Sequence, residues 1–297
     1  MNYKIQKRIL IFGFLFIPIV LNLMFLVYPF IKMFIMSFTD SNGISQTYKF
    51  VKFDNYETVF SDAHLWMSLK NNLYYFANGL IQNVLGLLFA YILSTKLRGR
   101  NLFKAIIFVP YILSSTAVAY TFNYIYDYGK GPLNVALIQF GLHPIRFLSS
   151  LSIVNVSLAF ICLWRYVGFT MVLYIAALQS VPSEIYEAGV VDGANSWQAF
   201  RYITLPNIKR IVELNLFLTL AGSFNAFTEA LILTGGGPGY ASSTFLTYTI
   251  DAFFKYGRYG FSCALSVILM ALIVLTTSIQ RRLILGKGDD ENSGLLR

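Results

Sequence analysis

The sequence predicts an all-α membrane protein that crosses the bilayer six times. Hydrophobic residues make up 56% of the 297-residue chain and charged residues only 12%, whereas soluble domains carry about 25% charged residues. The mean hydropathy is +0.60. Six apolar runs are each long enough to cross the hydrocarbon layer as a helix. Composition and run length therefore agree on the fold class.

The six spans are predicted from these apolar runs in order. They cover residues 9–38, 71–95, 103–126, 152–178, 208–233 and 260–281. The first run follows Lys4, Lys7 and Arg8, as the apolar part of a signal peptide would. It is too long for that part, and no small-residue cleavage pattern follows it, so we expect a retained helix.

The distribution of basic residues predicts the orientation. With the N-terminus in the cytoplasm, fourteen of the 23 Lys and Arg residues fall inside and seven outside, while Lys32 and Arg165 lie within spans. This bias places both termini in the cytoplasm. The predicted order is a cytoplasmic N-terminus (1–8), a membrane domain (9–285) and a cytoplasmic tail (286–297). Within the domain we expect external loops at 39–70, 127–151 and 234–259 and cytoplasmic segments at 96–102 and 179–207.

Several function classes are disfavoured. The net charge of +9 suggests nucleic acid, but the basic residues punctuate apolar runs instead of clustering. Cys162 and Cys263 lie in apolar spans, where a thiol acts as a small hydrophobe. His64 and His143 are expected to be solvated in external loops. The glycine run at 235–239 lacks the Lys-Ser/Thr of a phosphate-binding loop. We therefore expect no catalytic residue, metal site or bound cofactor.

The cytoplasmic segment 179–207 is polar and rich in small residues, which is unusual between two apolar spans. We expect Ser183 to cap a short helix that runs from 184 to about 191. Gly193 can then adopt the left-handed conformation that ends it. Asn195 or Ser196 is expected to cap a second short helix.

The composition of this segment suits a docking site. Pro206 fits the first turn of the fifth span, where its missing N–H costs nothing. Small residues at 188, 189, 193 and 194 allow close approach by a partner, and Glu187 and Asp192 can bind cationic side chains. An ordinary helical loop lying on the membrane surface fits the residues equally well.

A motif in this segment resembles a known family. Glu187-Ala188-Gly189, then Gly193, then Ile203-x-Leu205-Pro206 resembles the EAA loop of ABC importer permeases, with Gly189 where the family has a second Ala. The resemblance implies a type I importer permease whose loop forms a coupling helix seated on a cytoplasmic ATPase. The implied coupling residues are Glu184, Tyr186, Glu187, Ala188, Gly189, Asp192, Gly193, Ala194, Leu205 and Pro206.

Two further segments resemble the carbohydrate-uptake branch of that family. They are Trp164-Arg165-Tyr166-Val167-Gly168-Phe169 with the residues up to Pro182, and Leu233-Thr234-Gly235-Gly236-Gly237-Pro238 with Ser243-Thr244. The resemblance implies import of a sugar or oligosaccharide by alternating access in a bacterial or archaeal cell membrane. It also implies three kinds of partner: a second permease forming a heterodimer, two ATPase subunits holding ATP and Mg, and an extracellular binding protein.

Polar residues inside the spans are candidates for the substrate path. Arg165 lies near the middle of the fourth span, where a lone charge costs at least about 3 kcal/mol, and Glu229 can be its partner. Such a pair either lines the path or fixes helix packing. Spacings of three and four residues predict two polar helix faces. One face holds Asn225, Thr228 and Glu229, and the other holds Tyr120, Asn123 and Tyr124, which an interfacial aromatic belt explains equally well.

A transporter driven by an ion gradient is the alternative function. It would need carboxylates or broken helices within the membrane, usually in internal repeats. Only Glu213 and Glu229 lie within the predicted spans, and the sequence contains no repeat. The sequence therefore favours the importer permease.

Overall fold

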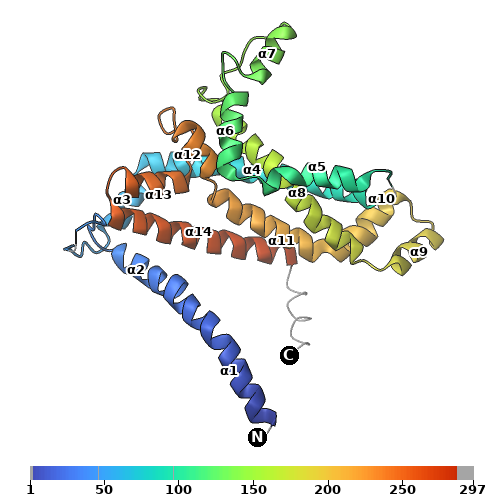
Figure 1. The fold of residues 1–297 in the computed structure, drawn as a ribbon, viewed down its shortest axis with the longest axis horizontal. Coiled ribbons are helices and arrows are strands. Elements are labelled where there is room, and N and C mark those ends of the chain that lie inside the picture. Colours follow the sequence, from blue (N-terminus) through green and yellow to red (C-terminus); the bar gives the residue numbers. More distant parts are fainter. Residues whose placement is uncertain (1–2, 46, 96, 286–297) are drawn as a thin grey trace. The chain divides into compact units, whose positions relative to one another are not determined.

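The computed structural model describes residues 3–45, 47–95 and 97–285. Over these ranges every regular element is a helix, and turns and loops join the helices; the one β-type pairing is an isolated antiparallel bridge between Thr39 and Phe50 (Figure 1). The chain divides into two compact units. The first comprises residues 1–62 and 249–271, and the second comprises residues 63–248 and 272–297. The predicted all-α fold class is confirmed.

The described residues contain five helices long and apolar enough to cross a membrane, and a sixth span if one bent pair of helices counts as one. The five are Leu10–Met36, Ala63–Ser94, Val154–Gln179, Ser196–Thr234 and Tyr259–Arg282, and the bent pair is Arg100–Ile112 with Ser115–Ile125. Each predicted span thus has its counterpart. The second begins eight residues earlier than predicted, because α4 (Ala63–Ser94) continues past the apolar run.

The first unit begins with the N-terminal span. α1 (Tyr3–Asn22), the π-helical turn η1 (Leu23–Val27) and α2 (Tyr28–Met36) follow without a break. The most apolar part of this span has 0% of its residues buried inside the chain. It therefore presents apolar surface on all sides, as a helix facing lipid or a partner subunit does.

A short polar segment and three more helices complete the first unit. They are α3 (Asp54–Ser61), the second half of α13 (Phe245–Phe254) and the first half of α14 (Tyr259–Leu285). The side-chain amide of Asn55 donates to the carbonyls of Ser37 and Thr39, each at 2.9 Å. The amide N–H of Gly260 donates to Ser41 at 2.8 Å, and a Cβ at Gly260 would overlap the Thr39 carbonyl. These bonds satisfy the irregular backbone after α2.

The second unit is built on α4, α8 (Val154–Gln179) and α11 (Leu205–Phe224), which pack against one another (Figure 1). One buried amide joins all three helices. Asn83 of α4 donates to Thr219 of α11 at 2.7 Å and accepts from the Tyr174 hydroxyl of α8 at 2.9 Å. Two apolar clusters lie on either side of this polar contact. One is Ala90, Leu93, Met171, Tyr174, Ile175, Ala177 and Ile208.

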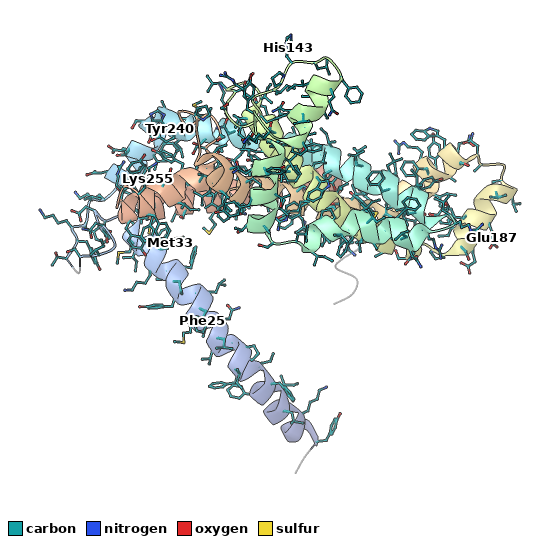
Figure 2. The ribbon with its side chains drawn as sticks, turned by 45° about the horizontal axis from the view of Figure 1, so that its top comes forward. Phe25, Met33, His143, Glu187, Tyr240 and Lys255 are labelled. Atoms are coloured by element: carbon teal, nitrogen blue, oxygen red, sulfur yellow. The ribbon has the colours of Figure 1, made fainter. Side chains whose placement is uncertain are left out.

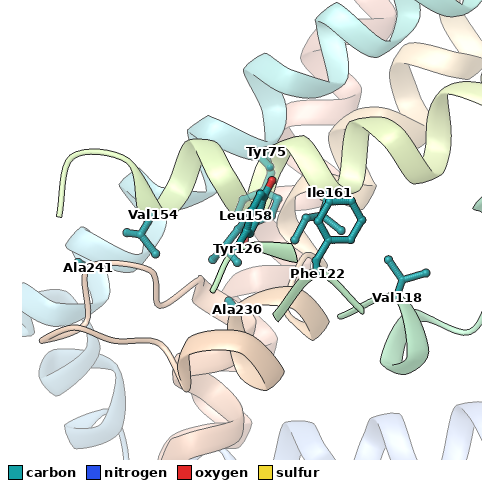
Figure 3. Packing of buried hydrophobic residues seen from close by; sticks show 10 residues of the cluster. Tyr75, Val118, Phe122, Tyr126, Val154, Leu158, Ile161, Ala230 and Ala241 are labelled. Carbon is teal, nitrogen blue, oxygen red and sulfur yellow. The ribbon is translucent and has the colours of Figure 1, made fainter. Parts of the chain in front are cut away.

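The other cluster lies around Tyr126, where the N-terminal half of α8 meets four other segments (Figure 3). Its members are Tyr75, Val118, Phe122, Tyr126, Val154, Leu158, Ala159, Ile161, Ala230 and Ala241. They come from α4, α6 (Ser115–Ile125) and the residue that caps it, α8, α12 (Thr228–Thr234) and the segment that follows α12. Burial of these side chains holds the short helices α6 and α12 against the long ones.

The third span is bent, where the sequence predicted one continuous helix over 103–126. α5 (Arg100–Ile112) and α6 meet at 98°. Pro110 supplies no N–H to the α5 ladder, and Leu113 and Ser114 have extended backbone (ψ 144° and 134°). α5 nevertheless packs closely on α8. Gly168 of α8 permits this approach, since a Cβ at that position would overlap the backbone of Ile107 and Phe108.

The predicted external loops contain helices that the sequence analysis did not predict. α7 (Pro132–Gln139) lies within 127–151, and α13 lies within 234–259. His64 is exposed, as predicted, but it lies in the first turn of α4 and not in a loop. Its ring stacks on that of Tyr240, with ring centroids 4.4 Å apart. His143 is exposed, as predicted (Figure 2).

Candidate functional site

The segment predicted to dock a partner forms two short helices. α9 (Ser183–Val191) begins after Pro182, so Ser183 is its first residue and not the predicted cap. Gly193 has a φ of +80° and ends the helix, as predicted. The Ala194 N–H donates back to the Gly189 carbonyl at 2.9 Å, which satisfies an acceptor at the helix end.

The second short helix, α10 (Ser196–Gln198), is fixed by Asn195. Its side chain accepts from the Gln198 N–H at 2.9 Å, and the Gln198 side chain accepts from the Asn195 N–H at 2.8 Å. This reciprocal capping box satisfies two backbone donors. Of the two caps that the sequence left open, Asn195 and Ser196, the helix uses Asn195.

The fifth span does not begin at Pro206, because helical structure continues unbroken from α10. The π-helical segment η2 (Ala199–Thr204) joins α10 to α11. In η2 the Leu205 N–H bonds to the carbonyl five residues back, at Phe200. This wider turn accommodates Pro206, which has no N–H and disfavours an α-helix through the preceding turn. The short helix α10 therefore forms the N-terminal end of the fifth span.

Side chains fasten α9 to that span. The Tyr186 hydroxyl lies 3.1 Å from the Thr204 hydroxyl, which is buried. Gly189 faces Ile203, whose side-chain tip would be 2.5 Å from a Cβ at position 189. Glycine in place of the family's alanine therefore fits the close packing seen here. Phe200 packs edge-on against Tyr91 of α4 at 5.4 Å, so the fastened loop also contacts the second span.

The predicted coupling residues divide into two sets. Tyr186, Gly189 and Ala194 are half-buried and hold the loop together. Exposed residues form the surface that a partner could contact. They are Glu184, Glu187, Ala188, Asp192, Gly193 and Pro206, together with Val190, Val191 and Trp197, and Leu205 is half-buried (Figure 2 labels Glu187). Trp197 was not among the predicted coupling residues. Its large side chain is 70% exposed and adds apolar area to this surface.

Arg165 and Glu229 come together as a buried ion pair. Nη1 of Arg165 lies 3.6 Å from Oε1 of Glu229, and the side chains are 11% and 6% exposed. The Arg165 guanidinium also lies over the Tyr166 ring, 5.0 Å from its centroid. Among the described residues, the Tyr75 hydroxyl, Nε of Arg165 and Oε1 of Glu229 have no hydrogen-bond partner. The pair neutralises two charges between α8 and α12 at a depth where either alone would be costly.

The prediction that Asn225, Thr228 and Glu229 share one helix face is wrong. α11 ends at Phe224, and α12 begins at Thr228 after a break. Asn225 is exposed and bonds back to Ala221, whereas Glu229 is buried. Tyr120, Asn123 and Tyr124 do lie on a single helix, α6, and all three are exposed. Their place in the substrate path remains a prediction.

Buried asparagines, which were not predicted, fix the segment after α12. Asn71 of α4 donates to the carbonyls of Tyr240 and Ser243, and Asn155 of α8 donates to that of Ala241 at 2.8 Å. Asn72 accepts from the Phe245 N–H at 2.9 Å. Polar residues within apolar spans are the signal that could have identified this network.

Comparisons with known proteins agree with this arrangement. Residues 82–285 match the family described as the binding-protein-dependent transport system inner membrane component. The probable ABC transporter permease protein YurN of Bacillus subtilis is 31% identical over 291 residues, covering 96% of this chain and 99% of YurN. The multiple sugar-binding transport system permease protein MsmF of Streptococcus mutans is 30% identical, covering 91% of this chain and 93% of MsmF.

Solved structures show the same fold. One chain in the crystal structure of a bacterial alginate ABC transporter, in complex with alginate pentasaccharide-bound periplasmic protein, matches with a TM-score of 0.82. The two sequences are 22% identical, and the match covers 93% of this chain and 94% of that one. The family match extends from the second span to the end of the sixth, and it includes the α9–α10 segment. This multi-pass membrane protein therefore belongs to the family of binding-protein-dependent transport system inner membrane components.

Proposed function

We propose that this chain is the permease subunit of an ATP-driven importer that carries a sugar or oligosaccharide into the cell by alternating access. Membership of the family supports the importer role. The sugar class is supported by the similarity to MsmF, a multiple sugar-binding transport system permease protein, and to the alginate transporter whose fold matches. The motifs at 164–182 and 233–244 resemble the same branch.

The observation that carries the proposal is the exposed surface of α9 and α10. It combines acidic side chains, Glu187 and Asp192, with Val190, Val191 and Trp197, which are 71%, 87% and 70% exposed. Exposed apolar side chains beside charged ones are typical of a protein interface. Because α10 is continuous with the fifth span, a force applied to this surface acts directly on a transmembrane helix.

The partners follow from this surface and its position. The exposed surface would contact a cytoplasmic ATPase that holds ATP and Mg, and this chain would itself catalyse no reaction. One such surface serves one ATPase, so a second permease is needed to form a pseudo-two-fold pore. The unburied N-terminal span offers apolar surface for that heterodimer. A binding protein would deliver substrate to the opposite face, and both termini would lie in the cytoplasm.

Reconstitution with the co-expressed second permease and ATPase tests the coupling surface. Glu187→Lys should release the ATPase from the purified complex and abolish ATP-dependent uptake, because it reverses a charge on the docking surface. Gly193→Val should do the same, since any side chain at φ +80° is strained. Glu57→Lys on exposed α3 makes the same charge change elsewhere and should leave ATPase retention intact.

Two outcomes would overturn the proposal. One is that both variants retain the ATPase as well as the unmodified chain does. The other is uptake that persists without ATP and collapses with an ionophore, which would identify a transporter driven by an ion gradient. A panel of sugars and oligosaccharides offered to the binding protein would identify the substrate.

A further inference from the structure

A groove of about 490 Å³ lies between α11 and α14, within the second unit. Its lining residues are Arg210, Ile211, Glu213, Leu214, Phe217, Thr277, Ser278, Gln280 and Arg281. It lies at the end of α11 that adjoins the α9–α10 surface, but it contains none of the residues of that surface. The role proposed above for the chain therefore does not account for it.

The residues that line the groove change from basic to apolar along α11. Arg210 lies in the second turn of α11 and Arg281 near the end of α14, so one end is basic. Leu214 and Phe217 follow on α11 and remain 45% and 43% exposed. From position 210 to 217 an α-helix rises about 10 Å. A basic entrance thus leads into a mainly apolar part of the groove.

The charged residues that line the groove favour an anion. Among the described lining residues, Arg210 and Arg281 are basic and Glu213 is acidic. The side-chain amide of Gln280 donates to the Glu213 carbonyl at 3.3 Å and so links the two walls. Its Oε1 is buried without a hydrogen-bond partner among the described residues, and a hydroxyl donor would satisfy it.

We propose that this groove binds an anionic phospholipid, with the phosphate between Arg210 and Arg281 and an acyl chain along Leu214 and Phe217. Basic pockets between transmembrane helices at the cytoplasmic face suit anionic headgroups. A glycerol headgroup also carries hydroxyl groups, one of which could donate a hydrogen bond to Oε1 of Gln280. A protein partner is less suited, because a basic entrance leading to an apolar channel matches the two-part chemistry of one lipid. The orientation rests on the proposed function, but lipid binding does not require transport.

Native mass spectrometry of the purified full-length chain tests the proposal directly. The delipidated chain is titrated with phosphatidylglycerol or with phosphatidylcholine, which has no net charge. Arg210→Gln/Arg281→Gln should lower phosphatidylglycerol binding about tenfold or more, because each basic residue contributes about 1 kcal/mol to anionic-lipid attraction. Arg98→Gln/Arg100→Gln removes the same charge from another exposed cytoplasmic site and should leave binding unchanged.

An equal loss in both double variants would overturn the proposal, because it would show attraction to net charge alone. Unchanged binding in the groove variant would also overturn it. A photoreactive residue at Leu214, with both arginines retained, gives an independent readout in native membranes. Adducts to phospholipid support the groove as a lipid site. Adducts to a second permease or to residues 286–297 of this chain would contradict it, whatever the result of the uptake assays.

Discussion

At the residue scale, the ion pair of Arg165 and Glu229 links two helices of the second unit. Both side chains are almost fully buried, and they join α8 to the short helix α12. A pair so enclosed has little surface left for a passing substrate. The geometry therefore favours the packing role over the path-lining role, the two roles that the sequence left open.

A double-variant cycle tests that role. Glu229→Gln should destabilise the chain by about 3–5 kcal/mol, because it leaves the Arg165 guanidinium buried without a counter-charge. Arg165→Met combined with Glu229→Gln should recover most of the loss and retain uptake. Thermal unfolding in detergent and uptake by the reconstituted complex give the two readouts. A double variant that is stable yet inactive would place the pair in the substrate path.

At the element scale, small residues set the distance between helices. Gly168 of α8 lies against the backbone of α5, and Gly86 of α4 lies against the Thr170 side chain of α8. In each case a Cβ would meet atoms closer than van der Waals contact allows. Close approach of this kind is how helices associate in lipid, where little hydrophobic driving force remains between them.

Gly168→Ala is expected to destabilise the chain by about 1–3 kcal/mol, because the new methyl group would push α5 away from α8. The opposing atoms are backbone atoms of Ile107 and Phe108, which cannot move as a side-chain tip can. Gly222→Ala is the matched control, since no atom lies within 4 Å of a Cβ there and helix propensity should rise. Equal unfolding midpoints for the two variants would contradict this explanation.

Sequence patterns predicted the long elements better than the short ones. Apolar runs located every span, and Gly193 marked the end of α9, because burial in lipid and positive φ leave direct traces in the sequence. The bend at Leu113 and the break after Phe224 lie inside apolar runs, so hydropathy could not reveal them. Contacts such as Tyr186 with Thr204 depend on the path of η2, which leaves no periodic signal.

At the scale of the whole molecule, the predicted orientation can be tested with two introduced cysteines. Cys162 and Cys263 lie within spans and would first be replaced by alanine. A cysteine at exposed His143 should then react with a membrane-impermeant maleimide in intact cells. A cysteine at exposed Asp192 should react only after permeabilisation, because the excess of basic residues predicts that this side faces the cytoplasm. The reverse labelling pattern would invert the topology.

The segment at 240–245 has one more consequence. Its backbone groups are held by side-chain amides from two spans: Asn71 and Asn72 of α4, and Asn155 of α8. Asn155 also donates to the Asn71 side chain at 3.1 Å, so the two spans meet beneath the segment. If α4 and α8 slide past each other, these bonds cannot all be kept and the segment must move. The conformation of residues 240–245 is therefore linked to the relative alignment of α4 and α8.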